Sequence, residues 1–419
     1  MGKDKKNILI IGNSASAQSL AKKLSKSPIA GEIFIAPGNN TTSELYKNID
    51  IREDDLTGLL KFVLENNISI TIPISENALK ADITSFFQTN GQNIFGPAKQ
   101  ACNIALNKAN GKKFLYRIHA QTSKFGIFDK MQMAQEWLNT ASFPVTIKCS
   151  EYNNLDDRLV CPTMTLALEF LDNLFSKGET GVLIEEFSLG ESFTIYYITD
   201  GYSAIPITSV RNYKFTQDGD GGIYTNGLGC YVPNYRISET VYTRIGNIVQ
   251  NTISALEKRS TPYIGILGVD CTITGEDKFF VNEFKPFFQD FDSSAVLNLI
   301  EDDLIEIFMA CIEGFFADEC EKISTNDKNS ISAVVWSRAY GKIIEGLENI
   351  EDFSNLDFYR IKNTNDNKIL TRKGENFVLT RTASTLTRAK TNLYDDLSEI
   401  KFDTIKYRTD IARELLTKY

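Results

Sequence analysis

The chain has 419 residues, 42% hydrophobic and 24% charged, which suits a globular protein of about two to four domains. Its net charge of −9 argues against a nucleic-acid partner, because such a partner is bound by neutralising its phosphates. No apolar run reaches the ~20 residues of a membrane helix, and the N-terminus leads directly into a strand-like run rather than a signal peptide, so we expect a cytoplasmic protein with no membrane partner.

The numbers and positions of the cysteines and histidines argue against several kinds of structural and catalytic site. The seven cysteines are scattered and form no CxxC pair, which favours reduced thiols over a disulfide framework or a zinc site. His119 is the only histidine, which argues strongly against a histidine-based triad or a multi-histidine metal site. It falls in a helix-like stretch, where we expect a surface or packing role.

The first hundred residues alternate between strand and helix patterns. The predicted elements are strands at 7–11, 32–36 and 68–74, and helices that end near residue 24 or span 56–66 and 77–89. This alternation predicts a doubly wound α/β domain. Such sheets bind ligands in the loops at the carboxyl ends of their strands. The corresponding loops here are Gly12–Ala15, Pro37–Asn39, Ser75–Asn77 and Gly96–Pro97.

The rest of the chain has an α+β pattern. Strand-like runs lie at 143–149, 181–187, 193–199, 204–210, 265–273 and 279–284, with helices at 164–177 and about 300–316. A polar break at Ser324–Ser330 indicates a domain boundary. The predicted tail has strands at 331–336, 357–361 and 377–382, a helix at 384–396 and a final helix near 408–418.

Two strand ends carry candidate nucleotide-binding side chains. Lys148 ends an apolar run, where a charge beside the core is costly unless an anion meets it, and a nucleotide phosphate is one such anion. A lysine that extends into solvent is the alternative. Glu185 and Glu186 end another strand, with Glu191 close behind. They could accept hydrogen bonds from an adenine amino group or a ribose, or simply form a solvated strand end.

Asp270 and Glu283 lie on two strand-like runs separated by the turn signal Gly275–Asp277, which predicts a hairpin with a carboxylate on each strand. Facing carboxylates are poor neighbours unless a cation lies between them, and Mg²⁺ favours a few carboxylates plus substrate phosphates. Lys285 would share a face with Glu283, so an ion pair with lysine is the competing interpretation.

The stretch Asp218–Gly222 reads Asp-Gly-Asp-Gly-Gly. Its glycines would let the backbone approach an anion or a substrate closely. A plain surface loop is an equal alternative, and the spacing of an EF-hand is not met.

Taken in order, these segments resemble the glycinamide ribonucleotide synthetase family, the ATP-grasp carboxylate–amine ligases of purine synthesis. The resemblance covers nearly the whole chain. The matching segments are Ile10–Asn13, Ala36–Asn39, Asn48–Ile51, Phe95–Pro97, Asn107–Phe114, Pro144–Lys148, Ile184–Phe187, Gly190–Glu191, Thr208–Lys214, Asp218–Asp220, Gly227–Pro233, Asp303–Glu306 and Asp410–Ile411.

The resemblance implies an ATP-grasp fold of the α/β and α+β classes, with a small C-terminal α+β domain. The implied domains are an N-terminal α/β substrate-side domain at 1–103, an ATP-grasp part with the small B subdomain at 104–190, a central ATP-grasp part at 191–327 and a C-terminal domain at 328–419. The implied activity activates glycine with ATP as an acyl phosphate, which phosphoribosylamine then attacks. We expect these small molecules or their analogues as partners, and a monomer or homodimer.

The resemblance also implies roles for particular residues. The nucleotide-binding set is Lys108, Lys148, Glu185, Glu186, Glu191 and Lys214. The substrate-binding set is Gly12, Asn13, Pro37, Gly38, Asn39, Glu76, Asp218 and Asp220. The implied Mg²⁺ ligands are Asp270 and Glu283.

Three segments depart from the family pattern. Residues 149–158 contain no glycine where the family has a glycine-rich phosphate loop, and they contain three acidic residues. Lys285 stands where the family has an asparagine metal ligand, and an ammonium cannot ligate Mg²⁺. Residues 15–18 read Ala-Ser-Ala-Gln in place of Gly-Arg-Glu-His.

Three hypotheses therefore stay open from the sequence. The first is an active ligase for glycine and phosphoribosylamine. The second is an ATP-grasp ligase with a different carboxylate or amine. The third is a non-catalytic paralogue that binds a nucleotide or a partner protein.

Overall fold

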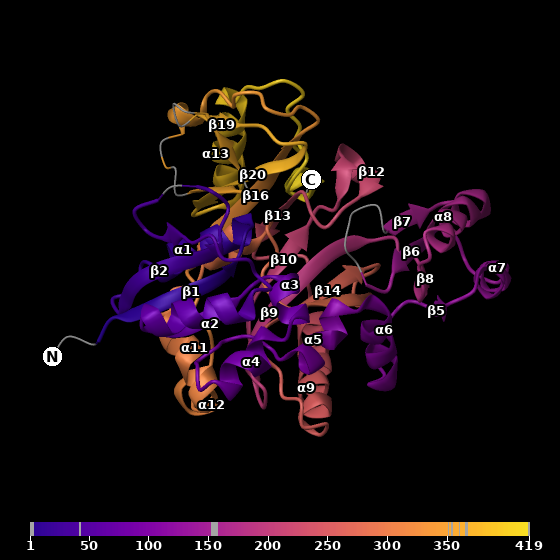
Figure 1. The fold of residues 1–419 in the computed structure, drawn as a ribbon. Helices are drawn as coiled ribbons and strands as arrows, with labels where there is room; N and C mark the ends of the chain where they lie inside the picture. The colour runs from indigo at the N-terminus through magenta and orange to yellow at the C-terminus, as the bar shows by residue number, and fades with distance from the viewer. Residues whose placement is uncertain are drawn as a thin grey trace.

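The computed structural model describes residues 4–417 except 42, 152–157, 351, 353–354, 360 and 365–367. Its three main sheets are an N-terminal parallel sheet, a small antiparallel sheet and a central sheet of eight strands. Figure 1 shows the small sheet with its helices projecting from one side of the molecule, and the C-terminal part above the central sheet. No helix in the described ranges is long and apolar enough to cross a membrane.

The N-terminal sheet has the strand order β3–β2–β1–β4, and all neighbours are parallel. Its strands are β1 (Lys6–Gly12), β2 (Ala30–Pro37), β3 (Lys47–Asn48) and β4 (Ile68–Pro73), and its helices are α1 (Ala15–Leu24), α2 (Leu56–Glu65), α3 (Glu76–Lys80) and α4 (Ile83–Thr89). Successive side chains of β1 are fully buried on both faces, as in a sheet covered by helices on both sides. The helix expected at 77–89 is two helices, because Asp82 adopts a left-handed conformation with φ 59° between them.

The small sheet has the antiparallel order β5–β8–β6–β7. Its strands are β5 (Phe125–Phe128), β6 (Val145–Cys149), β7 (Arg158–Cys161) and β8 (Val182–Glu186), and its helices are α7 (Met131–Leu138) and α8 (Met164–Ser176). The helices bury one face of the sheet around Val145, Ile147 and Leu171. The opposite face carries polar side chains, among them Lys148 and Glu185.

The central sheet has the order β15–β14–β9–β10–β13–β16–β20–β17. Its first five strands are β9 (Glu191–Asp200), β10 (Ala204–Asn212), β13 (Gly229–Val232), β14 (Ile264–Ile273) and β15 (Phe279–Lys285). One face packs on α5 (Lys99–Leu106), α6 (Lys108–Arg117) and α9 (Glu239–Glu257). The other packs on α10 (Ser293–Leu297), α11 (Leu304–Glu313) and the N-terminal sheet. Alternating side chains of β9 therefore enter different cores, Tyr197 toward α9 and Tyr196 toward α10.

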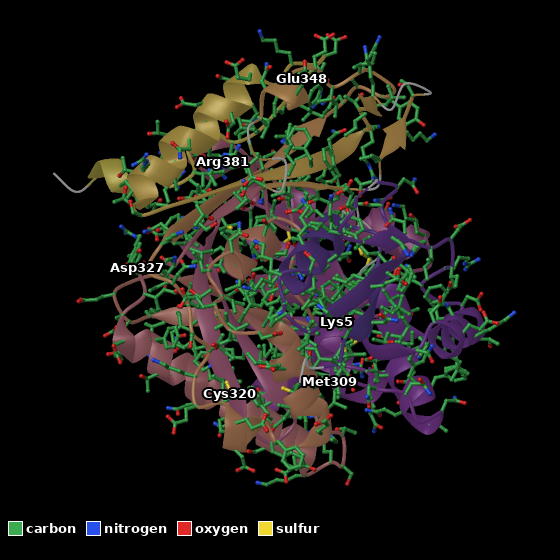
Figure 2. All side chains as sticks on the ribbon, turned by 90° about the vertical axis from the view of Figure 1, so that its left-hand side faces the viewer. Lys5, Met309, Cys320, Asp327, Glu348 and Arg381 are labelled. Atoms are coloured by element: carbon green, nitrogen blue, oxygen red, sulfur yellow. The ribbon has the colours of Figure 1, made fainter. Side chains whose placement is uncertain are left out.

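The longer strands of the C-terminal part continue this sheet, and β18 (Lys362–Asn363) and β19 (Ile369–Leu370) pair separately. It contributes β16 (Asn329–Ser337), β17 (Leu356–Phe358) and β20 (Gly374–Ala383), covered by α13 (Leu386–Glu399). Arg381 of β20, labelled in Figure 2, forms an ion pair with Asp396 of α13. Other short elements are α12 (Phe316–Glu319) and η3 (Leu347–Asn349). The predicted limits at 103/104, 190/191 and 327/328 stay predictions.

The predicted final helix near 408–418 is wrong for most of its length. Residues 402–412 form turns and irregular backbone, and only a short 3-10 helix, η5 (Arg413–Thr417), follows. Arg408 and Asp410 instead direct their side chains to residues 218–220, where Arg408 pairs with Asp220 and Asp410 accepts a hydrogen bond from the Gly219 amide.

Candidate nucleotide and substrate site

The N-terminus of α6 brings the first lysine to the small sheet. Asn107 caps the helix by accepting a hydrogen bond from the Asn110 amide at 2.9 Å. The Lys108 amide donates to the Ser150 carbonyl at 2.8 Å, which fixes the helix start beside the end of β6. Lys112 lies one turn further on the same helix face, as the four-residue spacing requires.

A buried triad joins α6 to the small sheet. The Glu185 carboxylate of β8 forms ion pairs with Lys148 of β6 and with Lys112, the latter at 2.8 Å. Lys112 also donates to the Thr122 hydroxyl at 2.7 Å. The side chains of the three charged residues are 2–10% exposed, so each charge depends on its partners.

The expected hairpin of β14 and β15 is present and places Asp270 opposite Glu283. Each carboxylate is bonded to a lysine, Asp270 to Lys214 and Glu283 to Lys285. Lys108 reaches the second oxygen of Glu283 at 3.3 Å. The α6 lysine thereby connects the hairpin with the small sheet.

Burial and neighbouring charges shift the pKa values in this cluster in different directions. Burial raises the pKa of Glu283, but the ammonium groups of Lys108 and Lys285 outweigh it and hold that pKa well below its usual value. Glu185 behaves in the same way, with its pKa lowered by its two lysines against the effect of burial. Burial acts to lower the pKa of Lys148, yet nearby carboxylates raise it to about 12. Both Lys148 and these carboxylates are therefore charged at neutral pH.

Two small cavities lie on either side of Lys148, Arg158 and Glu283. One, of about 40 Å³, reaches Lys108, Lys285 and Glu76. The other, of about 20 Å³, reaches Glu185, Phe187 and Tyr224. Each has room for little more than a water molecule or two, because charged side chains fill the space. A nucleotide would have to displace these side chains or open the small sheet.

A much wider pocket of about 910 Å³ adjoins the first cavity, because Asn226 and Gln289 line both. Its walls come from the central sheet and the C-terminal part, and include Trp336, Arg338, Tyr359, Lys373 and Lys406. Its size suits a small-molecule substrate, and its three cations outnumber the two carboxylates of Asp290 and Glu375.

Two of the expected nucleotide carboxylates lie outside the cluster. Glu186 lies 3.5 Å from Lys124 and accepts a hydrogen bond from the Ser142 amide, although it also borders the smaller cavity. Glu191 forms ion pairs with Arg236 at 2.9 Å and Arg211 at 3.5 Å. The structure thus brings Lys108, Lys148, Glu185, Lys214, Asp270 and Glu283 together and leaves Glu191 apart.

The predicted substrate-binding residues of the N-terminal sheet lie in different surroundings. Gly12 and Pro37 are register partners at the carboxyl edge of the sheet, where the Gly38 amide donates to the Gly12 carbonyl at 3.1 Å and Asn13 follows. The Asn39 side chain turns away and donates to the Phe358 carbonyl at 2.6 Å, which ties this loop to the C-terminal part. Glu76, at the start of α3, is the member of the set that lines the small cavity beside Lys108.

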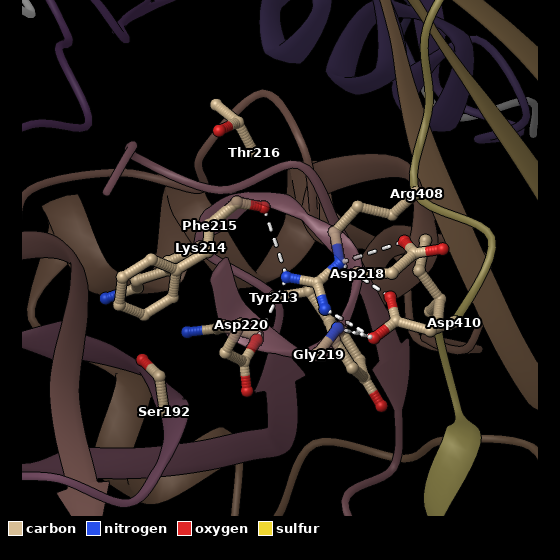
Figure 3. A network of polar contacts seen from close by, with 12 residues as sticks. Ser192, Tyr213, Lys214, Phe215, Thr216, Asp218, Gly219, Asp220, Arg408 and Asp410 are labelled. Atoms are coloured by element: carbon tan, nitrogen blue, oxygen red, sulfur yellow. Dashed lines mark hydrogen bonds and ion pairs between the residues drawn. The ribbon is translucent and has the colours of Figure 1, made fainter. Parts of the chain in front are cut away.

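Asp218 and Asp220 belong to a separate network around Arg408 (Figure 3). The fully buried Arg408 guanidinium bonds Asp220 at 2.9 Å and Asp410 at 2.6 Å, and Arg413 bonds both of these carboxylates. Asp218 accepts a hydrogen bond from the Thr409 amide at 3.0 Å. These contacts hold the loop between β11 (Phe215–Gln217) and β12 (Gly221–Tyr224) to the C-terminal segment, away from the lysine cluster.

Sequence reasoning missed two contributors, Lys112 and Arg158. Lys112 was detectable from its spacing to Lys108 on one helix face. Arg158 starts β7 opposite Lys148 and stacks on the Tyr224 ring at 5.0 Å, an arrangement that depends on strand register and on a distant loop. His119 is exposed just after α6 and takes no part in the cluster. Within the acidic stretch 149–158, residues 152–157 lie outside the described residues.

The fold and the cluster together define an ATP-grasp protein: a small antiparallel lobe and a central antiparallel sheet supply lysines and carboxylates to one site, next to a parallel α/β domain. Two family models match consecutive parts of the chain, phosphoribosylglycinamide synthetase, N domain, over residues 6–105 and its ATP-grasp (A) domain over residues 106–293. The chain belongs to the phosphoribosylglycinamide synthetase family and is an ATP-grasp ligase that resembles phosphoribosylamine–glycine ligase.

Similar proteins agree with this placement. A phosphoribosylamine–glycine ligase of Caldanaerobacter subterraneus subsp. tengcongensis is 29% identical over 417 residues, covering 97% of this chain and 99% of that protein. A bifunctional purine biosynthetic protein of Schizosaccharomyces pombe is 29% identical, covering 97% of this chain and 53% of that longer protein. The crystal structure of a phosphoribosylamine–glycine ligase from Thermotoga maritima has the same fold, with a TM-score of 0.80 at 20% identity, covering 97% of this chain and 100% of that one.

Proposed function

We propose that this ligase activates the carboxylate of glycine with ATP and joins it to the amine of phosphoribosylamine. The observation that supports the proposal is the convergence of Lys108 and Lys148 beside a cavity that adjoins a wide, cation-lined pocket. Phosphoryl transfer to a carboxylate needs positive charge around the transferring group, and an acyl phosphate needs a neighbouring amine.

In this proposal the phosphates lie beside Lys108, Lys148 and Lys285. Their ammonium groups stabilise the charge that develops on the transferring phosphoryl group, and their carboxylate partners orient them before the nucleotide arrives. The adenosine then lies in the neighbouring cavity, against Glu185, Glu186 and Phe187.

Magnesium is the cofactor expected with ATP in this superfamily, but the residues present do not fit a protein-bound ion as they stand. Asp270 and Glu283 are each bonded to a buried lysine. No group of three or more His, Cys, Asp or Glu side chains among the described residues is placed to hold a metal ion. No step of the proposed mechanism is therefore assigned to such an ion.

We assign the wide pocket to the amine substrate. Arg338, Lys373 and Lys406 offer exposed cations for a sugar phosphate, and the Trp336 and Tyr359 rings offer apolar surface for the sugar. A different amine or carboxylate is the second candidate. It is favoured by two departures from the family pattern. Lys285 lines the small cavity that adjoins this pocket, and Ala15–Gln18 reach the pocket wall through the Ser16 amide, which donates to Asp290 at 2.9 Å.

Location and assembly are proposals of the same kind. We propose a cytoplasmic enzyme, because all seven cysteines are free thiols and such thiols persist in a reducing compartment. A monomer or homodimer remains our proposal for its assembly.

The test is ADP release by the purified protein supplied with ATP, glycine and phosphoribosylamine generated in situ. We expect release that requires both acceptor substrates. A synthetase of known activity serves as the positive control. If that control turns over and the present protein releases no ADP, the proposed reaction is wrong, and other acid–amine pairs then test the second candidate.

A further inference from the structure

Both carboxylate oxygens of Asp270 already have a donor within the protein. Its Oδ2 atom bonds the Lys214 ammonium, and its Oδ1 atom accepts a hydrogen bond from the Asn282 amide at 2.9 Å. Both side chains of the ion pair are buried, with Lys214 5% and Asp270 2% exposed. The Thr225 amide and hydroxyl both donate to the Lys214 carbonyl, so the backbone that carries this lysine is fixed as well.

The facing carboxylate, Glu283, has the same arrangement. Its Oε1 atom bonds Lys285, and its Oε2 atom lies 3.3 Å from the Lys108 ammonium. Every oxygen of the two carboxylates therefore has a donor within the protein. Lys285 lies two residues from Glu283 on the same strand, so its ammonium stays on the same face of β15.

A divalent ion at this position would have to displace buried cations. Mg²⁺ demands ligand oxygens at about 2.0–2.1 Å and near-octahedral geometry, and an ammonium supplies no lone pair. Moving Lys214 or Lys285 aside would leave a buried ammonium unpaired, and keeping it in place would set two positive charges against each other in a site of low dielectric.

The cluster as a whole carries an excess of positive charge. Leaving out Glu76 and Glu186, which pair with Lys80 and Lys124 outside the cluster, six cations face three carboxylates, an excess of three positive charges when all are ionised. The cations are Lys108, Lys112, Lys148, Lys214, Lys285 and Arg158, and the carboxylates are Asp270, Glu185 and Glu283. Such an excess complements a nucleoside triphosphate that carries no metal.

We propose that Lys285 and Lys214 take the place of a protein-bound divalent cation, so that this protein binds the phosphates of ATP without magnesium. The inference rests on the proposed use of ATP. Fixed ammonium groups supply the positive charge that an ion held by Asp270 and Glu283 would otherwise bring.

Calorimetric titration of the full-length protein with ATP, once in EDTA and once in excess Mg²⁺, tests the inference. We expect the two dissociation constants to agree within about twofold, and those of Lys285→Asn to differ by about tenfold or more, with the weaker binding in EDTA. Asparagine removes the ammonium and restores an oxygen ligand beside Glu283. Lys278→Asn, on the exposed end of the same hairpin, is the matched control and should behave as the wild type.

The possible outcomes separate the inference from the proposed function. Wild-type binding that is about tenfold or more tighter with Mg²⁺ overturns the inference and leaves the ligase proposal standing. Wild-type binding under neither condition overturns both. The wild-type comparison decides the inference by itself if Lys285→Asn fails to fold.

Discussion

The Lys108 ammonium lies 3.3 Å from the Glu283 carboxylate, and this contact joins the first turn of α6 to strand β15. Lys108 also follows the Asn107 cap and bonds the end of β6 through its amide. One residue therefore links the helix, the small sheet and the central hairpin, and a shift of the small sheet would be transmitted to the carboxylate cluster.

Replacement of Lys148 should remove nucleotide-dependent turnover. Its ammonium lines both cavities, and loss of one charge-stabilising group commonly reduces the rate by about 100-fold or more. We expect Lys148→Ala to lower kcat/KM for ATP by at least that factor, measured as ADP release. Lys61→Ala, on the exposed face of α2, is the control and should retain full activity. Turnover in Lys148→Ala comparable with the wild type would exclude Lys148 from the phosphate site.

Removal of the Glu185 carboxylate should destabilise the protein. The Lys112 and Lys148 ammonium groups are buried against it, so Glu185→Ala leaves two uncompensated charges at an expected cost of about 3–5 kcal/mol in the free energy of unfolding. Urea denaturation measures this, with exposed Glu65→Ala as the control.

The same variant has a predicted pH dependence. The folded-state pKa of Glu185 is lowered, because its two lysines outweigh the effect of burial. Its contribution is therefore complete above the pKa of an unfolded glutamate, and is lost as the pH falls through the folded-state value. The difference between the wild type and Glu185→Ala should shrink on acidification. A difference that stays constant down to the acid transition would contradict this electrostatic role.

Arg408 should stabilise the chain without contacting substrate. Its buried guanidinium bonds Asp220 and Asp410, which keep Arg413 as a second partner, so Arg408→Ala should cost about 1–3 kcal/mol in the free energy of unfolding. The side chain of Asp218 is 46% exposed, and Asp218→Asn should cost less than about 1 kcal/mol. Thermal or urea unfolding ranks the two variants. A large rise in KM for glycine or the amine in Asp218→Asn, with unchanged stability, would instead support the substrate role expected from the sequence.

The wide pocket gives a substrate-specific prediction. If Arg338 and Lys373 hold a sugar phosphate, each alanine variant loses a charge-assisted hydrogen bond, and KM for phosphoribosylamine should rise about tenfold or more. KM for ATP should not change, because these residues do not line the two cavities beside Lys148. Lys401→Ala, which lies on the surface away from the pocket, serves as the control. Equal rises in both KM values would indicate a general loss of structure.

Much of this architecture was predictable from local sequence patterns. Apolar runs of four to seven residues marked the buried strands of the N-terminal and central sheets. The turn at Gly275–Asp277 marked the hairpin that carries Asp270 and Glu283. Local patterns did not reveal that Asp82 would divide a helix or that Arg408 would hold an irregular segment through ion pairs, because both depend on backbone conformation or on partners far along the chain.

The candidate site likewise contains residues that local sequence patterns reveal and pairings that they do not. Lys148 and Glu185 were found because charges at the ends of apolar strands are conspicuous in sequence. The sequence left open whether Lys285 or a metal ion would face the carboxylates, since this depends on which lysine reaches which oxygen. The structure pairs Lys285 with Glu283 and Lys214 with Asp270, and the second of these pairs joins residues 56 positions apart.

Asp292 should make the stability of the protein fall as the pH rises through neutrality. Its side chain is completely buried, accepts hydrogen bonds from the Tyr196 hydroxyl at 2.8 Å and the Gln289 amide at 3.0 Å, and has its pKa raised by burial to about 8. The folded state therefore holds a proton that an unfolded aspartate releases near pH 4. Since the folded state binds more protons between these values, the group's contribution is complete below the unfolded pKa and is lost as the pH rises toward about 8.

Asp292→Asn keeps the shape and removes the titration, so it should flatten this part of the pH profile. Urea unfolding should be measured at intervals from pH 5 to pH 9. We expect the free energy of unfolding of the variant to rise relative to that of the wild type toward the alkaline end, by an amount on the order of a few kcal/mol. Asp318→Asn, at an exposed position of α12, controls for the change in net charge. If the two profiles run parallel across this range, Asp292 is ionised in the folded protein and its charge is stabilised by its neighbours in spite of burial.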